Sequence, residues 1–171
     1  ERVERAIAGV DGSTWFVPQA RIAERSKATR APYVFLAKSE GVVTLQVDNG
    51  GITDSGTVTI AGSLGLQAQS DIALNNTLSV SGPLSLHTIA GNATIINQVG
   101  IDLTPHVSGD ITGNLSLTAV TGNITDSGGS VIVTGTGTFT TQATDADILL
   151  DEPISIGGAI TLNTTGATGN A

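Results

Sequence analysis

Carboxylates crowd one short stretch of the chain. Asp145, Asp147, Asp151 and Glu152 lie within eight residues and form the only tight acidic cluster of the sequence. Calcium takes carboxylate oxygens as ligands, so this cluster is the best candidate for a cation site. The Gly-Gly-x-Gly-x-Asp calcium repeat is absent, however, and a solvated acidic corner explains the same four residues. We therefore expect no cofactor, with Ca²⁺ as the one alternative.

Enzymatic chemistry on polysaccharides needs residues that the chain does not supply well. Hydrolases use paired carboxylates, for which the acidic cluster is the only candidate. Lyases commonly use Arg or Lys, and neither occurs after Lys38. Phe139 is the only aromatic residue after Phe35, so stacking platforms for sugars are scarce. We expect no catalysis, and a carbohydrate-active enzyme is only the third hypothesis for function.

Two histidines offer little metal or acid–base chemistry. His87 and His106 are about twenty residues apart, each without a second His nearby in the sequence, and the chain has no Cys. A zinc site normally combines several Cys and His ligands, so the spacing favours two independent surface histidines.

Alternating threonines raise one further possibility. Ordered ranks of Thr on a flat β-surface can bind ice, and Thr134, Thr136, Thr138 and Thr140 alternate. The sequence aligns these positions with Thr57 and Thr59, with Thr77 and Ser79, and with Ser155. On that alignment the rank does not persist, and Thr is an ordinary surface residue of strands.

Charge divides the chain near residue 40. Residues 1–40 carry seven basic and five acidic groups, whereas residues 41–171 carry ten acidic groups and no basic one. The acidic part repels phosphate backbones, so we expect no nucleic acid partner. No apolar run is long enough to span a bilayer, so we expect no membrane insertion of this segment. The division predicts a basic cap, linker or joining segment over 1–40 and a second region over 41–171.

The second region repeats itself. The pentapeptide ITDSG occurs at residues 52–56 and again at 124–128. Similar blocks begin near Ile52, Ile72, Ala93, Ile124 and Ile148, and the third block holds an insertion around residues 105–113. Each block contains a short apolar piece, a small polar turn and strands with period-2 alternation, which indicates one buried face.

Three short strands in about 22 residues, repeated, predict a solenoid. We expect an all-β, right-handed parallel β-helix of about five to six coils. Gly and Asn at the corners favour turns. Equivalent corner residues are predicted to stack and to hydrogen-bond along the axis; they are Asp71, Asn92, Asn123, Asp147 and Asn170.

The first 32 residues do not fit this repeat. They predict an irregular or short helical cap, because the end of a β-helix exposes an apolar cross-section. Trp15, Phe16, Tyr33 and Phe35 make this part a possible joining segment.

The phrases ITDSGG and GGAITLNTTGATGN, with Gly-Asn corners at residues 91–92, 122–123 and 169–170, resemble the repeat region of filamentous haemagglutinin-type exoproteins and autotransporter-like bacterial adhesins. The resemblance covers about residues 43–171. It implies a structural or adhesive shaft segment of a large secreted bacterial protein, located extracellularly at the cell surface, with a host-cell or matrix surface as partner. The alternative is a self-assembling extracellular filament, whose subunits join copies of themselves end to end or by strand addition.

Overall fold

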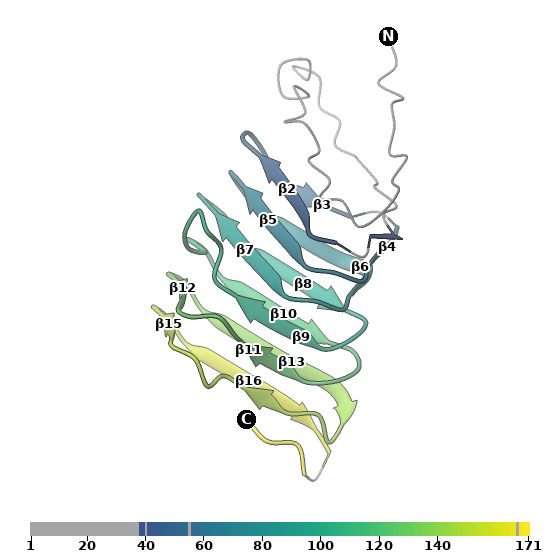
Figure 1. Cartoon of the computed structure of the whole chain (residues 1–171). Coiled ribbons are helices and arrows are strands. Elements are labelled where there is room, and N and C mark those ends of the chain that lie inside the picture. The colour runs from purple at the N-terminus through teal and green to yellow at the C-terminus, as the bar shows by residue number, and fades with distance from the viewer. Residues whose placement is uncertain (1–37, 40, 55, 167) are drawn as a thin grey trace.

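The computed structural model describes residues 38, 39, 41–54, 56–166 and 168–171. These residues form sixteen strands and no helix (Figure 1). The strands are β1 (Lys38–Ser39), β2 (Val43–Val47), β3 (Ile52–Thr53), β4 (Thr57–Ile60), β5 (Leu64–Ala68), β6 (Ile72–Val80), β7 (Leu84–Thr88), β8 (Ala93–Asn97), β9 (Ile101–Thr104), β10 (Leu115–Ala119), β11 (Ile124–Asp126), β12 (Val131–Val133), β13 (Gly137–Thr144), β14 (Ile148–Leu149), β15 (Ile154–Ile156) and β16 (Ile160–Thr165).

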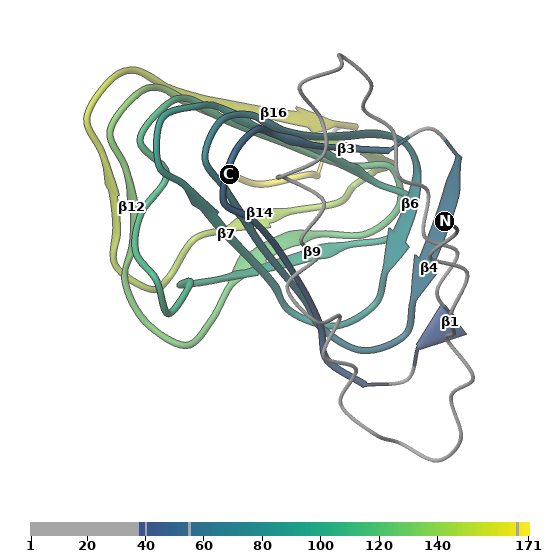
Figure 2. The ribbon, with the colours of Figure 1, turned by 90° about the horizontal axis from the view of Figure 1, so that it is seen from above.

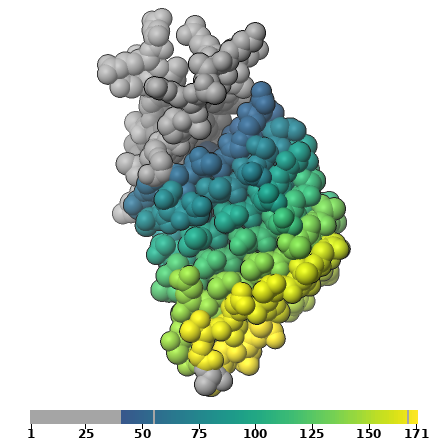
Figure 3. Space-filling view, turned by 180° about the vertical axis from the view of Figure 1, so that it is seen from behind, coloured from purple at the N-terminus to yellow at the C-terminus, as the bar shows by residue number. Residues whose placement is uncertain are grey.

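All of these strands pair in parallel, and paired residues lie 19 to 24 positions apart. One sheet has the order β14-β11-β9-β7-β5-β2, and a larger one has the order β1-β4-β6-β8-β10-β13-β16 with β3 also beside β6. A third, small sheet pairs β12 with β15. The chain therefore winds as a parallel β-solenoid of about six turns, which appear as stacked bands of colour in Figure 3. This confirms the predicted parallel β-helix, while its right-handed sense stays a prediction.

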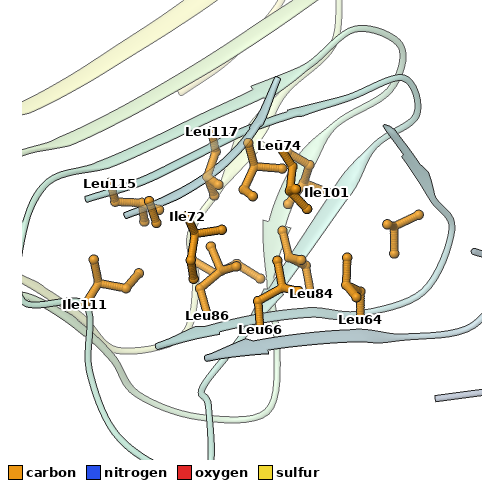
Figure 4. Packing of buried hydrophobic residues seen from close by; sticks show 14 of the residues in the cluster. Leu64, Leu66, Ile72, Leu74, Leu84, Leu86, Ile101, Ile111, Leu115 and Leu117 are labelled. Atoms are coloured by element: carbon orange, nitrogen blue, oxygen red, sulfur yellow. The ribbon is translucent and has the colours of Figure 1, made fainter. Parts of the chain in front are cut away.

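The core is a set of apolar ranks that run along the solenoid axis. In β7 and β10, buried residues alternate with half-buried ones, as a strand with one inward face requires. Ile95, Leu117 and Phe139 follow one another in register on successive turns, and all three are fully buried. Figure 4 shows Leu and Ile side chains from different sides of the coil pointing into the shared interior. Burial of this apolar surface is the main favourable term for the fold.

The third side of the coil changes place along the solenoid. In the early turns the second half of β6 pairs with β4, beyond the bend at Asn75 and Asn76. In the late turns β12 and β15 supply a short side that follows β11 and β14. Seen from above, β4 and β12 lie on opposite sides of the outline (Figure 2). The cross-section therefore shifts sideways while the two long sheets continue through all the turns.

Asn97 lies where this shift occurs. Its side chain is only 2% exposed. Its Oδ1 accepts the N–H of Val80 at 2.8 Å, and its Nδ2 donates to the carbonyls of Val80 at 2.9 Å and Gly100 at 2.8 Å. The amide thus satisfies backbone groups at the end of β6 that the shorter β8 leaves without a strand partner.

Because of this shift, the predicted block starts belong to two separate series of strand-paired residues that run along the solenoid axis, which we call lines of register. Ile52, Ile72 and Ala93 lie on one line, which continues through Leu115. Ile124 and Ile148 instead share a second line with Ile101. The predicted step from residue 93 to residue 124 is therefore longer than one turn, because it crosses from one line to the other. The loop at residues 105–110 lies within the predicted insertion, between β9 and the bridge residue Ile111.

Within the predicted cap or joining segment over 1–40, only Lys38 and Ser39 are described, as β1, and Trp15, Phe16, Tyr33 and Phe35 lie outside the described residues. The boundary near residue 40 therefore stays a prediction.

Candidate functional site

A groove of about 660 Å³ lies on the outer face of β2, β5 and β7. Thr44, Gly65 and Ser85 stand in register on successive turns and contribute to its lining, with Thr104 next in the same row. The loop that follows β9 forms another part of the lining, from Pro105 to Ser108. The solenoid supplies a flat floor, and the loop adds a wall above it.

Gly65 lies in the floor and is buried beneath its neighbours. A Cβ atom at this position would lie 3.2 Å from Ser85 Oγ, 3.7 Å from Thr44 Oγ1 and 3.9 Å from His106 Nε2. The loop therefore reaches back over two turns, from beyond β9 to β5. A side chain at residue 65 would have to displace these three side chains and so would change the shape of the groove.

The two histidines that the sequence analysis kept apart lie face to face. The ring centroids of His87 and His106 are 5.8 Å apart, with 17° between the ring planes. The carbonyl oxygen of Asp110 is 2.7 Å from His87 Nδ1, so this nitrogen donates its proton. The N–H of Ser108 donates to His106 Nδ1 at 3.1 Å, so neutral His106 carries its proton on Nε2. The sequence predicted an insertion at this loop but gave no signal that the loop brings His106 to His87.

Burial lowers the pKa of His106 below its usual value, and the nearby His87 lowers it further. The hydrogen bond from Ser108 acts in the same direction, because a protonated Nδ1 cannot accept it. Imidazole binds a metal in its own ring plane, and two stacked rings do not point their lone pairs at one ion. We therefore interpret the stacked histidines as a neutral contact that holds the loop against β7, and not as a metal site.

The acidic cluster divides between two corners of the coil. Asp145 and Asp147 precede β14, whereas Asp151 and Glu152 form the turn between β14 and β15. Within the described ranges, no group of three or more His, Cys, Asp or Glu side chains lies close enough to hold a metal ion. The four carboxylates considered for Ca²⁺ are thus not gathered into one site.

The predicted corner residues lie in two hydrogen-bonded ladders. In the first, Asp71 accepts the N–H of Asn92 at 2.8 Å, and Asn92 in turn accepts the N–H of Asn114 at 2.9 Å. The second ladder contains the other three residues: Asn123 accepts the N–H of Asp147, and Asp147 accepts the N–H of Asn170, both at 2.9 Å.

Asn114 belongs to the first ladder but was not among the predicted corners. It continues the ladder by accepting the N–H of Thr136 at 2.8 Å. The sequence carried a signal for it, because Asn114 precedes the alternating strand β10 just as Asn92 precedes β8.

The threonine row on the large sheet has other members than the sequence alignment gave it. Thr138 stands in register with Thr94, Ser116 and Thr161, not with Thr57 or Thr77, and the row also contains Ala73. The alignment was wrong because it placed the blocks on a single line of register, whereas the expectation that the rank is not continuous agrees with Ser116 and Ala73. The neighbouring row runs Ile96, Thr118, Thr140 and Asn163, so it is not uniformly threonine.

Fold and corner ladders define a parallel β-solenoid built from sequence repeats. The chain belongs to the family described as repeats of unknown function (DUF5649), whose model matches residues 36–87 and 90–163. No curated protein and no solved structure matches the chain. None of the described residues belongs to a helix that could cross a membrane.

Proposed function

We propose that this solenoid is a structural and adhesive shaft segment of a large secreted bacterial surface protein, and that it has no catalytic role. The observation that carries the proposal is the unbroken stack of about six turns, joined by two long parallel sheets. The strands of each turn pair only with those of the neighbouring turns, so length can be added by repeating the unit. Such a rod holds other parts of a protein away from the surface to which it is attached.

The use of the carboxylates supports a structural role. Asp71, Asp126 and Asp147 accept backbone N–H groups from the next turn. A hydrolase would instead need two carboxylates facing each other across a substrate. These three carboxylates therefore stabilise the corners between successive turns.

Deleting one whole turn tests the proposal. Leu115 and Gly137 are register partners, so removal of residues 115–136 places Gly137 directly beyond Ala93 on the same line. We expect the shortened chain to fold and its long dimension in small-angle X-ray scattering to fall by about 4.8 Å. Deletion of residues 115–125 is the control, because half a turn breaks the register and should prevent folding. Collapse of the whole-turn variant, or polysaccharide cleavage by the intact chain, would contradict a shaft.

A second candidate function is end-to-end assembly, in which another copy of the chain would pack on the turn that contains β16. Ile160 and Leu162 are register partners of Gly137 and Phe139, yet they are 55% and 40% exposed. A second copy that pairs a strand with β16 would cover them. We expect filaments in negative-stain electron microscopy that lengthen with concentration and vanish in Leu162→Lys. Short rods at every concentration would contradict this candidate.

A further inference from the structure

Hydrogen-bonding groups in the groove on β2, β5 and β7 are left without partners. The side chains of Thr44, Gln67 and Ser85 make no hydrogen bond within the described part of the chain, although all three line the groove. The Nε2 of His106 lies over Gly65 in the floor of the groove. Hydroxyl and amide groups both donate and accept, so the groove offers both roles within one short surface.

The groove is neutral, although the solenoid is acidic. Of its lining residues none is Asp, Glu, Lys or Arg, whereas residues 41–171 carry ten carboxylates. A ligand bound here therefore has no ionic partner in the lining. Apolar groups lie among the polar ones, with Val42 and Val107 strongly exposed and Pro83 and Pro105 beside them.

We propose that this groove binds a neutral oligosaccharide. Sugar hydroxyls both donate and accept hydrogen bonds, as the groove side chains do. The described lining of the groove has no aromatic platform, so the C–H faces of sugar rings would pack on the valines and prolines instead. The volume of about 660 Å³ lies in the range of small-molecule sites. The inference deepens the proposed function, since it rests on an adhesive shaft and names the class of ligand that the shaft would hold.

Two other polymers fit this surface less well. An extended peptide that adds to a sheet needs a free strand edge. Among the described strands of the groove only β2 ends the sheet, whereas β5 and β7 are paired on both sides, so an added strand would lie beside the groove and not in it. A nucleic acid needs basic groups, which the described turns lack beyond Lys38.

Calorimetric titration of the full chain with neutral linear trisaccharides of glucose, mannose and N-acetylglucosamine tests the proposal. We expect at least one of them to bind saturably, with a Kd of about 1 mM or lower. Gly65→Val would displace Ser85, Thr44 and His106 from their places in the groove and should weaken that affinity at least about tenfold. Gln67→Ala, which removes a hydrogen-bonding group without adding bulk, should weaken it several-fold. Thr118→Val is the matched control, because it changes an outward residue of β10 on the other sheet and should leave the affinity unchanged.

Several results would overturn the proposal: saturable binding of none of these sugars, equal affinity in folded Gly65→Val and Gln67→Ala, or binding of a neutral Ser/Gln peptide in their place. Thermal unfolding of each variant shows whether it is folded. X-ray scattering separates the two proposals, because Gly65→Val should keep the length of the rod while it loses the sugar. A shaft without sugar binding would overturn only the groove.

Discussion

Asp54 and Asp126 make the same contact on different sides of the solenoid. Each is the third residue of an ITDSG pentapeptide, and each carboxylate accepts backbone N–H groups from the turn one coil later. For Asp54 the donors are Asn75 at 3.1 Å and Asn76 at 3.2 Å. Asp54 follows β3 in the large sheet, whereas Asp126 ends β11 in the six-stranded sheet. The pentapeptide therefore encodes a strand, a cap and a turn, and not a fixed position in the coil.

The environment of Asp126 predicts an unusual response to substitution. Its side chain is 5% exposed, and Oδ1 accepts the N–H groups of Asp151 at 2.9 Å and Glu152 at 3.2 Å, while Oδ2 is buried without a partner. Asp126→Ala should lower the free energy of unfolding by about 1–3 kcal/mol, because both N–H groups lose their acceptor. Asp126→Asn keeps the acceptor for both N–H groups, so it should lose less than Asp126→Ala. Urea unfolding measures the free energy of unfolding of both variants. Equal losses of this free energy in the two variants would contradict the assigned contact.

Asn97 should be far more costly to replace than an exposed asparagine. Asn97→Ala leaves the N–H and the carbonyl of Val80 without partners in a buried place, so we expect a loss of about 2–4 kcal/mol. Asn163→Ala is the control, since Asn163 is exposed and makes a single bond to Thr140. Its cost should stay below about 1 kcal/mol in the same urea titration. Similar costs at the two sites would show that Asn97 does not hold the shift between register lines.

Gly137 and Phe139 should be energetically coupled. A Cβ atom on Gly137 would lie 3.1 Å from Phe139 Cε2 and 2.5 Å from Ile156 Cδ1, so the missing side chain makes room for the largest side chain of the core. We expect Gly137→Ala and Phe139→Leu each to destabilise the fold, by overpacking and by a cavity respectively. The double variant should lose less than the sum, by about 0.5–1 kcal/mol. Strict additivity in unfolding experiments would argue against this coupling.

The His87–His106 contact predicts a stability that depends on pH. Because the pKa of folded His106 lies below that of the unfolded chain, the unfolded state binds the proton more readily. The stability from His106 is therefore complete above about pH 6.5 and is lost as the pH falls through the lowered pKa. Asp110 is the one carboxylate of the loop, and it contacts His87 through its backbone carbonyl.

Urea midpoints at pH 7.5 and pH 5.5 measure this effect. We expect the difference between the two midpoints to be smaller in His106→Gln than in wild type. An NMR titration of the ring protons should give His106 a lower pKa than an unperturbed histidine. An identical pH dependence in the variant would exclude His106 as its source.

Local patterns predicted the strands but not all of their partners. The alternation of Leu84 and Leu86 indicated β7 correctly, because which face is buried follows from period 2 alone. The sideways shift gave no such signal, since Asn97 reads as an ordinary polar strand residue until Val80 of the preceding turn is known. The register between turns depends on residues that are far apart in the sequence. The repeated pentapeptide suggested a single line of register, whereas its two copies lie on different lines.

The candidate groove also depended on a non-local contact. Thr44, Gly65 and Ser85 each fit a predicted strand, and nothing in the sequence singled them out. His106 was judged to lack a nearby histidine because the spacing to His87 is long, yet the loop that carries it folds back across two turns. Sequence patterns predict the strands of one solenoid turn well, whereas the position of a loop that crosses several turns depends on its packing against them.

The short distance between paired strands along the chain bears on how the protein folds. Every strand pairs with one that lies 19 to 24 residues away, and none pairs with a distant part of the chain. Closing each turn therefore costs the entropy of ordering one short loop, and this entropy cost is about the same for every turn that is added. We expect the first two turns to be the slow step, after which each finished turn serves as a template for the next as the chain emerges.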